Sequence, residues 1–299
     1  MALGQHLATS SGLWGLSVKV HSGGCREAQG EVHGYPAGDP LMPSPEQFSA
    51  IEGGFLVICD ARTGSGFLCD RLDQHPELAC HHELFNSHFM GSKYGVEPFH
   101  RSSETDPLAY LADVRARTRV CSGARLIGFK LHFRHSPTVL EHVLNDRKER
   151  IILLRRRDKL AQWGSYQLAN ATGQWTRTNH AGEPHSLKRV PFAFWRYVVF
   201  LVHQQAWEQH VLGWRPDCLR VHYEDLLVPG GLAPLLRGLG VDSSVEPRSA
   251  SQRQFTGDST CARFTNPRWA ATASRIGQGL SILLALLGAT PMIRRLTNY

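Results

Sequence analysis

The chain has 299 residues, of which 42% are hydrophobic and 20% are charged. This balance excludes a mostly disordered chain and a coiled coil, and the length allows one large domain with a sizeable core. The net charge of +7 favours anionic ligands, but it is too small to indicate nucleic-acid binding. Seven cysteines without a C-x-x-C pair predict neither a zinc cluster nor a disulfide framework.

The first part of the chain is poor in regular structure. Residues 1–48 are rich in Gly, Ser, Pro and His, so we predict an irregular extension there and a single α/β domain at 49–299. There is no basic stretch before a strong apolar run, and no apolar stretch is long enough to span a bilayer. We expect a cytoplasmic protein without a transmembrane segment, while the lack of acidic residues before Glu27 leaves an organelle-targeting role open.

Strands and helices alternate from Gly54 onward. The short apolar run Phe55–Cys59 predicts a buried strand, and a glycine-containing loop and a helix ended by Pro76 follow it. We predict further strands at Arg125–Phe133, at Ile151–Leu154 and within 217–227, and further helices after the capping residue Asp158 and over Pro191–Trp214. This order predicts a three-layer α/β domain of the P-loop type, with a central parallel sheet flanked by helices.

The loop after the first strand has features of an anion site. Its residues are Arg62, Thr63, Gly64, Ser65, Gly66 and Phe67. The glycines allow a tight turn in which backbone N–H groups converge, and the helix N-terminus and Arg62 add positive charge. The loop therefore predicts phosphate or sulfate binding, with an ordinary connecting turn as the alternative. It lacks the lysine of the ATPase P-loop, which argues against a small-molecule kinase.

Two further segments carry candidate chemistry. Arg157 follows the strand at Ile151–Leu154, and Ser165 lies eight residues later, so the two side chains can flank one anion; a solvated strand end with a buried serine is the alternative. Glu83 lies in the segment Cys80–Asn86, and a carboxylate near an anion site suggests proton transfer. His81 and His82 are alternative proton acceptors, or partly buried polar groups.

In this order, the three segments resemble the sulfotransferase family, whose donor is 3′-phosphoadenosine-5′-phosphosulfate (PAPS). The similarity is to the bacterial carbohydrate and lipopolysaccharide type, which includes trehalose sulfotransferase. It covers roughly Gly54–Leu227, through RTGSGFL at 62–68, the pair Arg157 and Ser165, and DRLDQHPELACHHELFN at 70–86. It implies that residues 62–67 hold the 5′-phosphosulfate, that Arg157 and Ser165 hold the 3′-phosphate, and that Glu83 is the catalytic base with Arg62 stabilising the transferred charge.

The sequence departs from the family pattern in two places. Gly66 stands where many members carry Thr or Asn, which removes one side-chain contact to the donor. Arg253 only loosely resembles a basic residue that closes over the nucleotide. The segments around 87–120 and 172–190 are predicted to form the acceptor pocket, with candidate contacts Tyr94, His100, Arg101, Trp175, Arg177 and His185.

The resemblance implies transfer of a sulfuryl group from PAPS to an acceptor hydroxyl, with a carbohydrate or glycolipid as the expected acceptor. We expect no metal, because the clustered His and Cys spacing of a metal site is lacking, and no nucleic-acid partner. The alternative is a catalytically silent nucleotide- or glycan-binding protein on the same fold. The sequence indicates neither the particular acceptor nor the oligomeric state.

Overall fold

The computed structural model describes residues 53–86, 93–96, 99, 106–132, 135–173, 175, 189–245, 247 and 260–286. All of these belong to one compact unit of the chain, Leu41–Tyr299. The predicted extension at 1–48 lies outside the described residues. So do five predicted site residues, namely His100, Arg101, Arg177, His185 and Arg253.

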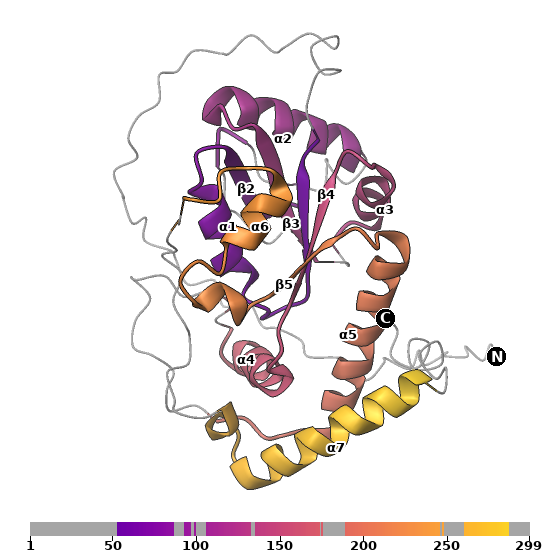
Figure 1. Ribbon diagram of the computed structural model, residues 1–299. Helices are drawn as coiled ribbons and strands as arrows, with labels where there is room; N and C mark the ends of the chain where they lie inside the picture. Colours follow the sequence, from indigo (N-terminus) through magenta and orange to yellow (C-terminus); the bar gives the residue numbers. More distant parts are fainter. Residues whose placement is uncertain are drawn as a thin grey trace, which may run out of the picture. The chain divides into compact units, whose positions relative to one another are not determined.

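A five-stranded sheet forms the centre of this unit (Figure 1). Its strands are β1 (Phe55–Cys59), β2 (Leu78–Glu83), β3 (Leu126–His132), β4 (Arg150–Arg155) and β5 (Leu219–His222). Their order is β2-β3-β1-β4-β5, and every neighbouring pair is parallel. The predicted parallel α/β sheet is thereby confirmed. The sequence analysis did not predict β2, because its two histidines interrupt the apolar run that marks a buried strand.

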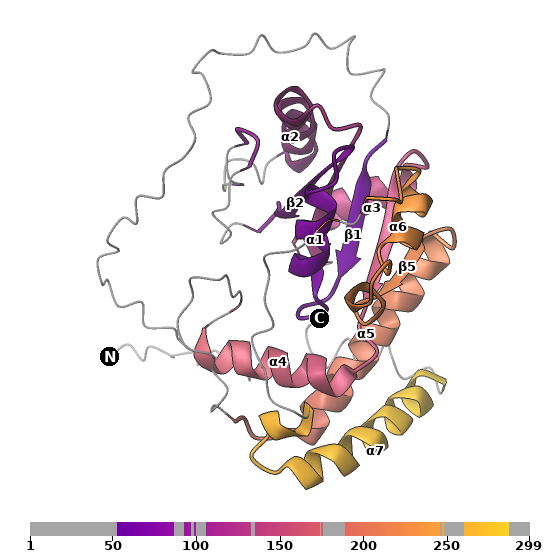
Figure 2. The same cartoon turned by 60° about the vertical axis from the view of Figure 1, so that its left-hand side comes forward.

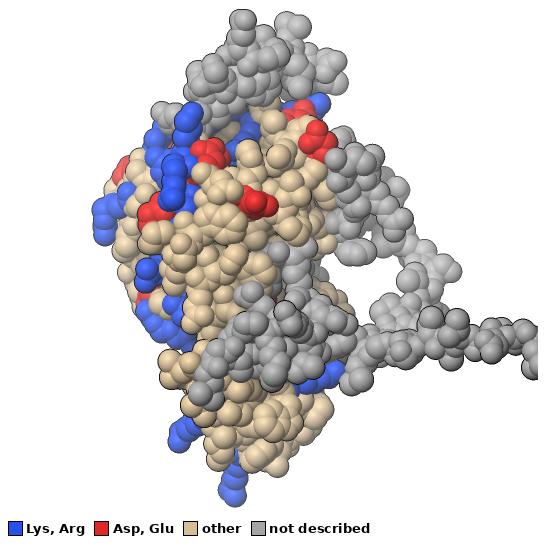
Figure 3. All heavy atoms as spheres, turned by 90° about the vertical axis from the view of Figure 1, so that its right-hand side faces the viewer, with Lys and Arg blue, Asp and Glu red and all other residues tan. Residues whose placement is uncertain are grey.

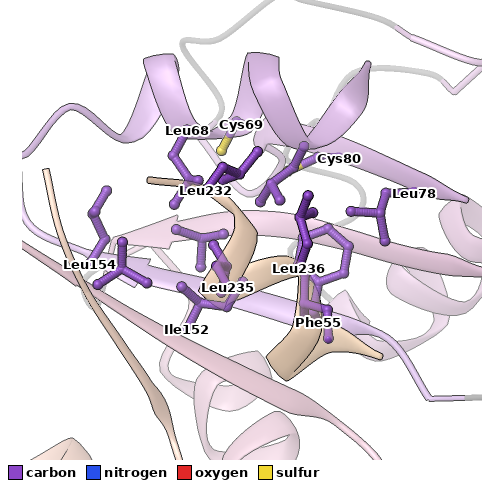
Figure 4. Packing of buried hydrophobic residues seen from close by; sticks show 14 of the residues in the cluster. Phe55, Leu68, Cys69, Leu78, Cys80, Ile152, Leu154, Leu232, Leu235 and Leu236 are labelled. Carbon is purple, nitrogen blue, oxygen red and sulfur yellow. The ribbon is translucent and has the colours of Figure 1, made fainter. Parts of the chain in front are cut away.

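Helices cover both faces of the sheet (Figures 1 and 2). The α-helices are α1 (Ser65–Asp73), α2 (Pro107–Ser122), α3 (Pro137–Asn145), α4 (Lys159–Thr172), α5 (Phe194–Trp214), α6 (Ala233–Leu239) and α7 (Pro267–Leu286). Two short 3-10 turns are η3 (Asp225–Leu227) and η4 (Thr260–Arg263). Successive strand residues point to opposite faces, so β1 contributes Phe55 and Val57 to the core beneath α1 and α6, part of which is shown in Figure 4. The alternate residues Leu56 and Ile58 belong to the core beneath α2, α3 and α5.

The connections of the sheet reverse direction beside β1. The chain moves from β1 to β2 through α1 on one face, and then returns across the sheet through helices on the other face. Right-handed crossovers require this change of face when the direction of winding changes. The neighbouring strands β1 and β4 therefore send their following loops to opposite sides. In sheets of this kind the crevice at the carboxyl ends of such strands is the usual place for a ligand.

Polar side chains cap the N-terminal ends of α2, α3 and α4. The Asp158 carboxylate accepts a hydrogen bond from the Ala161 N–H at 2.8 Å, which confirms the predicted cap of α4. Helix α5 begins three residues later than predicted, because Val190 forms a β-bridge with Phe264 and the chain stays extended through Ala193. None of the helices in the described ranges is long and apolar enough to cross a membrane.

Candidate functional site

The loop between β1 and α1 turns through left-handed backbone conformations. Gly64 has a φ of 87°, and a Cβ atom placed on it would lie 2.1 Å from the Tyr223 ring. Arg62 also has a positive φ, of 63°, which is unusual for a residue with a side chain. Only glycine satisfies both demands at position 64. The loop is therefore held in one conformation by its contact with Tyr223.

Side chains from α4 and α5 fix the base of this loop. Thr63 Oγ1 donates to the Asp60 carbonyl at 2.9 Å, and Gln162 Nε2 donates to the Ala61 carbonyl at 2.9 Å. Gln204 Nε2 donates to Asp60 Oδ2 at 2.8 Å. These bonds satisfy polar groups at the buried end of the loop, so its outer N–H groups at the start of α1 are the ones available to a ligand.

The predicted loop residues differ in their burial and in their contacts. Ser65 is buried, and burial raises the pKa of the Cys59 thiol at the end of β1 to about 12. Phe67 packs edge-on against Tyr223, with ring centroids 6.1 Å apart. A Cβ atom added at Gly66, by contrast, would meet nothing within 4 Å. Thr63 and Ser65 thus support the loop, and the space beside Gly66 is open.

The structure pairs Ser165 with Arg62. Arg62 Nε donates to Ser165 Oγ at 2.9 Å, and the same guanidinium donates to the Trp175 carbonyl. Arg157, the predicted partner of Ser165, is exposed and instead forms a two-pronged ion pair with Asp225, at 2.6 and 2.8 Å. The described conformation therefore does not bring Arg157 to Ser165, and a role for Arg157 in binding phosphate stays a prediction.

Two arginines that the sequence analysis did not single out lie beside Arg62. Arg156 Nη1 donates to the Arg62 carbonyl at 3.2 Å, and its guanidinium lies 5.0 Å from the centre of the Tyr223 ring. Burial, with repulsion from Arg156, lowers the pKa of Arg62 to about 10. Burial and the charges of Arg156 and Arg62 lower the pKa of Arg263 to the same value, although Asp158 opposes this. An anion placed here would relieve the repulsion among three guanidinium groups.

Glu83 is held in a separate ionic cluster at the end of β2. A β-bulge between His81 and Glu83 makes Glu83 the register partner of Lys130. The Glu83 carboxylate accepts hydrogen bonds from Lys130 Nζ at 2.8 Å and Asn86 Nδ2 at 2.6 Å, and His132 Nε2 lies 3.4 Å away. Burial would raise the pKa of Glu83, but His132 and Lys130 together hold it well below its ordinary value. The carboxylate is therefore ionised at neutral pH.

The two histidines of β2 have other partners. His81 Nε2 is hydrogen-bonded with Thr118 Oγ1 at 2.7 Å, and burial lowers its pKa to about 4. His82 Nε2 lies 2.8 Å from Asp70 Oδ1. The histidine in contact with the Glu83 carboxylate is His132, on the neighbouring strand. His132 is thus a better placed alternative to Glu83 as proton acceptor than His81 or His82.

Arg62 lies in the loop after β1, and Glu83 lies at the carboxyl end of β2. Glu83 pairs with Lys130 and Lys130 with Val57, so one strand separates Glu83 from β1. Two strand spacings separate β1 from β2 by roughly 10 Å, and Arg62 lies three residues beyond the end of β1. A ligand that contacts both must therefore extend across β3.

The residues that the sequence analysis missed differ in how clearly the sequence marks them as candidates. Lys130 interrupts an apolar strand with a charge, which is a recognisable signal of a buried pair. Arg156 belongs to the basic run at 155–157, but only the direction of its side chain distinguishes it from its neighbours. Arg263 reaches the site from η4, 107 residues after Arg156 and 201 after Arg62, and nothing in the local sequence marks it.

Comparison with known proteins assigns no family: no protein-family model matches the sequence, and no curated protein matches it significantly. The function is therefore inferred from the geometry of the site and from the motifs that occupy it.

The two loop glycines yield a matched pair of substitutions. We expect Gly64→Ala to lower the free energy of unfolding by about 1–3 kcal/mol, because its Cβ would overlap the Tyr223 ring at an unfavourable φ. Gly66→Ala, in open space in the first turn of α1, is expected to be neutral or stabilising. Urea unfolding of both variants measures the difference. Equal losses would show that the loop is not held against Tyr223 as described.

A second prediction concerns the buried ion pair. Lys130 is 5% exposed, so Glu83→Gln leaves its charge without a carboxylate and should lower the free energy of unfolding by about 3 kcal/mol. Adding Lys130→Met to that variant removes the orphaned charge and should restore most of the loss. Asp113→Asn, which breaks the exposed pair with Arg117, is the control and should cost less than about 1 kcal/mol. A double variant less stable than Glu83→Gln would contradict this account.

Proposed function

We propose that the chain is a PAPS-dependent sulfotransferase, built on a P-loop-type α/β domain, that transfers a sulfuryl group to a hydroxyl of a carbohydrate or glycolipid. The observation that carries this proposal is that Arg62, Arg156 and Arg263 gather beside a glycine loop. This loop lies where the connections between the parallel strands change direction. Three neighbouring guanidinium groups favour a ligand with more than one negative charge, which PAPS is. The resemblance in the motifs supports the same donor.

The residues present suit both ends of such a donor. The N–H groups at the start of α1 and Arg62 would hold the 5′-phosphosulfate, with the open space at Gly66 admitting it closely. Ser165 and Arg157 would hold the 3′-phosphate. Arg157 must then leave Asp225, but an exposed ion pair contributes little, so the exchange costs little. The proposal needs no metal, because arginines and N–H groups supply the positive charge.

The proposed reaction uses Glu83 as general base. The acceptor oxygen forms a bond to sulfur as the bond from sulfur to the donor's phosphate oxygen breaks, and Glu83 takes the hydroxyl proton. Lys130 and His132 keep the carboxylate ionised and oriented for this step. Arg62 stabilises the charge that develops on the departing phosphate oxygen. The acceptor would therefore lie over the carboxyl end of β3, between Glu83 and the glycine loop.

One observation favours the second candidate, a silent nucleotide- or glycan-binding protein. Against the effect of burial, His132 and Lys130 lower the pKa of Glu83 and make it a weak proton acceptor. A base held in this way must lose part of its stabilisation when substrate binds. The same fold could then bind a nucleotide without turnover, and the two experiments below separate these outcomes.

Calorimetric titration with adenosine 3′,5′-bisphosphate and with AMP, in the absence of metal, tests the donor site. We expect the bisphosphate to bind at least about tenfold more tightly, since a second phosphate meets charge-assisted donors. Arg62→Ala should weaken both ligands, whereas Arg157→Ala should weaken mainly the bisphosphate. Arg237→Ala, on the exposed side of α6, is the control and should change neither affinity. Absence of binding by either nucleotide would refute the proposed donor.

Transfer of labelled sulfate from PAPS to a panel of sugars and glycolipids tests the chemistry. We expect the Glu83→Gln/Lys130→Met variant to bind the bisphosphate within about twofold of wild type and to lose about a hundredfold or more in turnover. Turnover that survives in this variant would transfer the base role to His132. Tight bisphosphate binding by the wild type without transfer to any acceptor would favour the silent binding protein.

A further inference from the structure

Helix α7 presents an apolar face to solvent. Trp269, Ile276 and Leu283 are 47%, 54% and 50% exposed, and their spacing of seven residues places them in one row along the helix. Leu286, also exposed, lies beside this row, and the exposed Ile282 follows Arg268 and Arg275 at the same spacing of seven residues. Exposed apolar side chains gathered on one helix, rather than scattered singly, mark an interaction surface.

The opposite face of α7 explains why these side chains point outward. Its buried residues are small: Ala270, Ala273, Ser274, Gly277 and Ser281. They allow α7 to lie close against α5, where a Cβ atom on Gly277 would come within 3.1 Å of the Tyr197 ring. Trp269, Ile276 and Leu283 are therefore left on the outer face.

The start of α5 extends this face. Trp195 is 68% exposed, and Phe194 lies between Trp195 and Trp269 with ring centroids 5.1 and 6.4 Å away. We define the α7 face as Trp195, Trp269, Ile276, Ile282, Leu283 and Leu286. Its two exposed tryptophans combine an apolar ring with a polar N–H, which is the chemistry favoured at a membrane–water interface.

Among the described residues, α7 and the start of α5 carry charge of one sign. Arg268 and Arg275 are exposed and lie one position before Trp269 and Ile276, so a basic row runs beside the apolar one. The described residues 264–286 and 189–207 contain four arginines and no acidic residue. Figure 3 shows blue and tan spheres without red in the lower part of its view, where α7 lies in Figure 1.

We propose that the α7 face binds the surface of a membrane that contains anionic lipid, with the helix lying in the plane of the interface. Apolar side chains would enter the boundary of the acyl chains while the arginines contact lipid phosphates, the pattern of interfacial amphipathic helices. A twofold contact between two copies of the chain would instead set the same basic rows against each other, which charge repulsion opposes. This inference is independent of the proposed sulfotransferase activity.

Vesicle co-sedimentation of the full chain tests the inference, without any nucleotide or acceptor. We expect binding to phosphatidylcholine vesicles containing about one third phosphatidylglycerol, and at least about tenfold weaker binding to pure phosphatidylcholine. Ile276→Glu should weaken the anionic binding by about tenfold or more, whereas Val120→Glu, which is equally exposed at 54% on α2, should leave it unchanged. The double variant Arg268→Ala/Arg275→Ala should weaken the anionic binding similarly. The double variant Lys148→Ala/Arg237→Ala removes the same charge elsewhere and serves as its control.

Three results would overturn the inference. These are no vesicle binding, equal binding to both kinds of vesicle, and binding that the α7 variants and their controls change alike. A light-scattering measurement without vesicles tests whether a second copy of the chain covers the α7 face instead. A wild-type dimer that Ile276→Glu dissociates would identify the α7 face as a contact between copies. Circular dichroism of each variant verifies that the fold is intact.

Discussion

The close approach of Gly64 to the Tyr223 ring is the constraint on which the rest of the site depends. It presses the loop after β1 against the segment after β5, although β4 lies between the two strands. The same ring contacts Phe67 on one side and Arg156 on another. A side chain at position 64 would separate these elements, and the start of α1 would lose its position relative to Arg62 and Ser165.

The two ionic clusters around Arg62 and Glu83, both at the carboxyl ends of the strands, are arranged in contrasting ways. Around Arg62 three guanidinium groups gather, and burial together with their mutual repulsion lowers the pKa values of Arg62 and Arg263, so an anionic ligand is favoured. Around Glu83 the carboxylate is compensated by Lys130 and His132, so its pKa falls because the ionised form is stabilised. The first arrangement is suited to binding a polyanion and the second to holding a carboxylate in a fixed orientation.

One face of helix α7 packs against α5, and the other face is exposed and available to a partner. Small residues let it pack closely on α5, and this packing turns its tryptophan, isoleucines and leucines outward. Burial of apolar area normally opposes such exposure, since each large apolar side chain left in water forgoes a stabilising contribution of about 1.5–3 kcal/mol. A surface of that kind, bordered by Arg268 and Arg275, is better suited to contact with an anionic lipid surface than to exposure to water.

The sequence by itself determined the parallel α/β architecture, four of the five strands, the Asp158 cap and the location of the glycine loop. These features follow from local signals, namely apolar periodicity, turn residues and capping side chains, which act over a few neighbouring positions. It also located Arg62, Ser165 and Glu83 as the residues of interest.

Only the tertiary structure decided which of these residues meet. Ser165 contacts Arg62 rather than Arg157, because Asp225 draws Arg157 outward, and Arg263 joins the site from a segment without any local motif. Likewise the partners of Glu83 depend on a bulge that shifts its strand by one residue against β3. Contacts of this kind depend on strand register and on the crossing of distant segments, and a one-residue change in register alters every partner while leaving the local sequence signals the same.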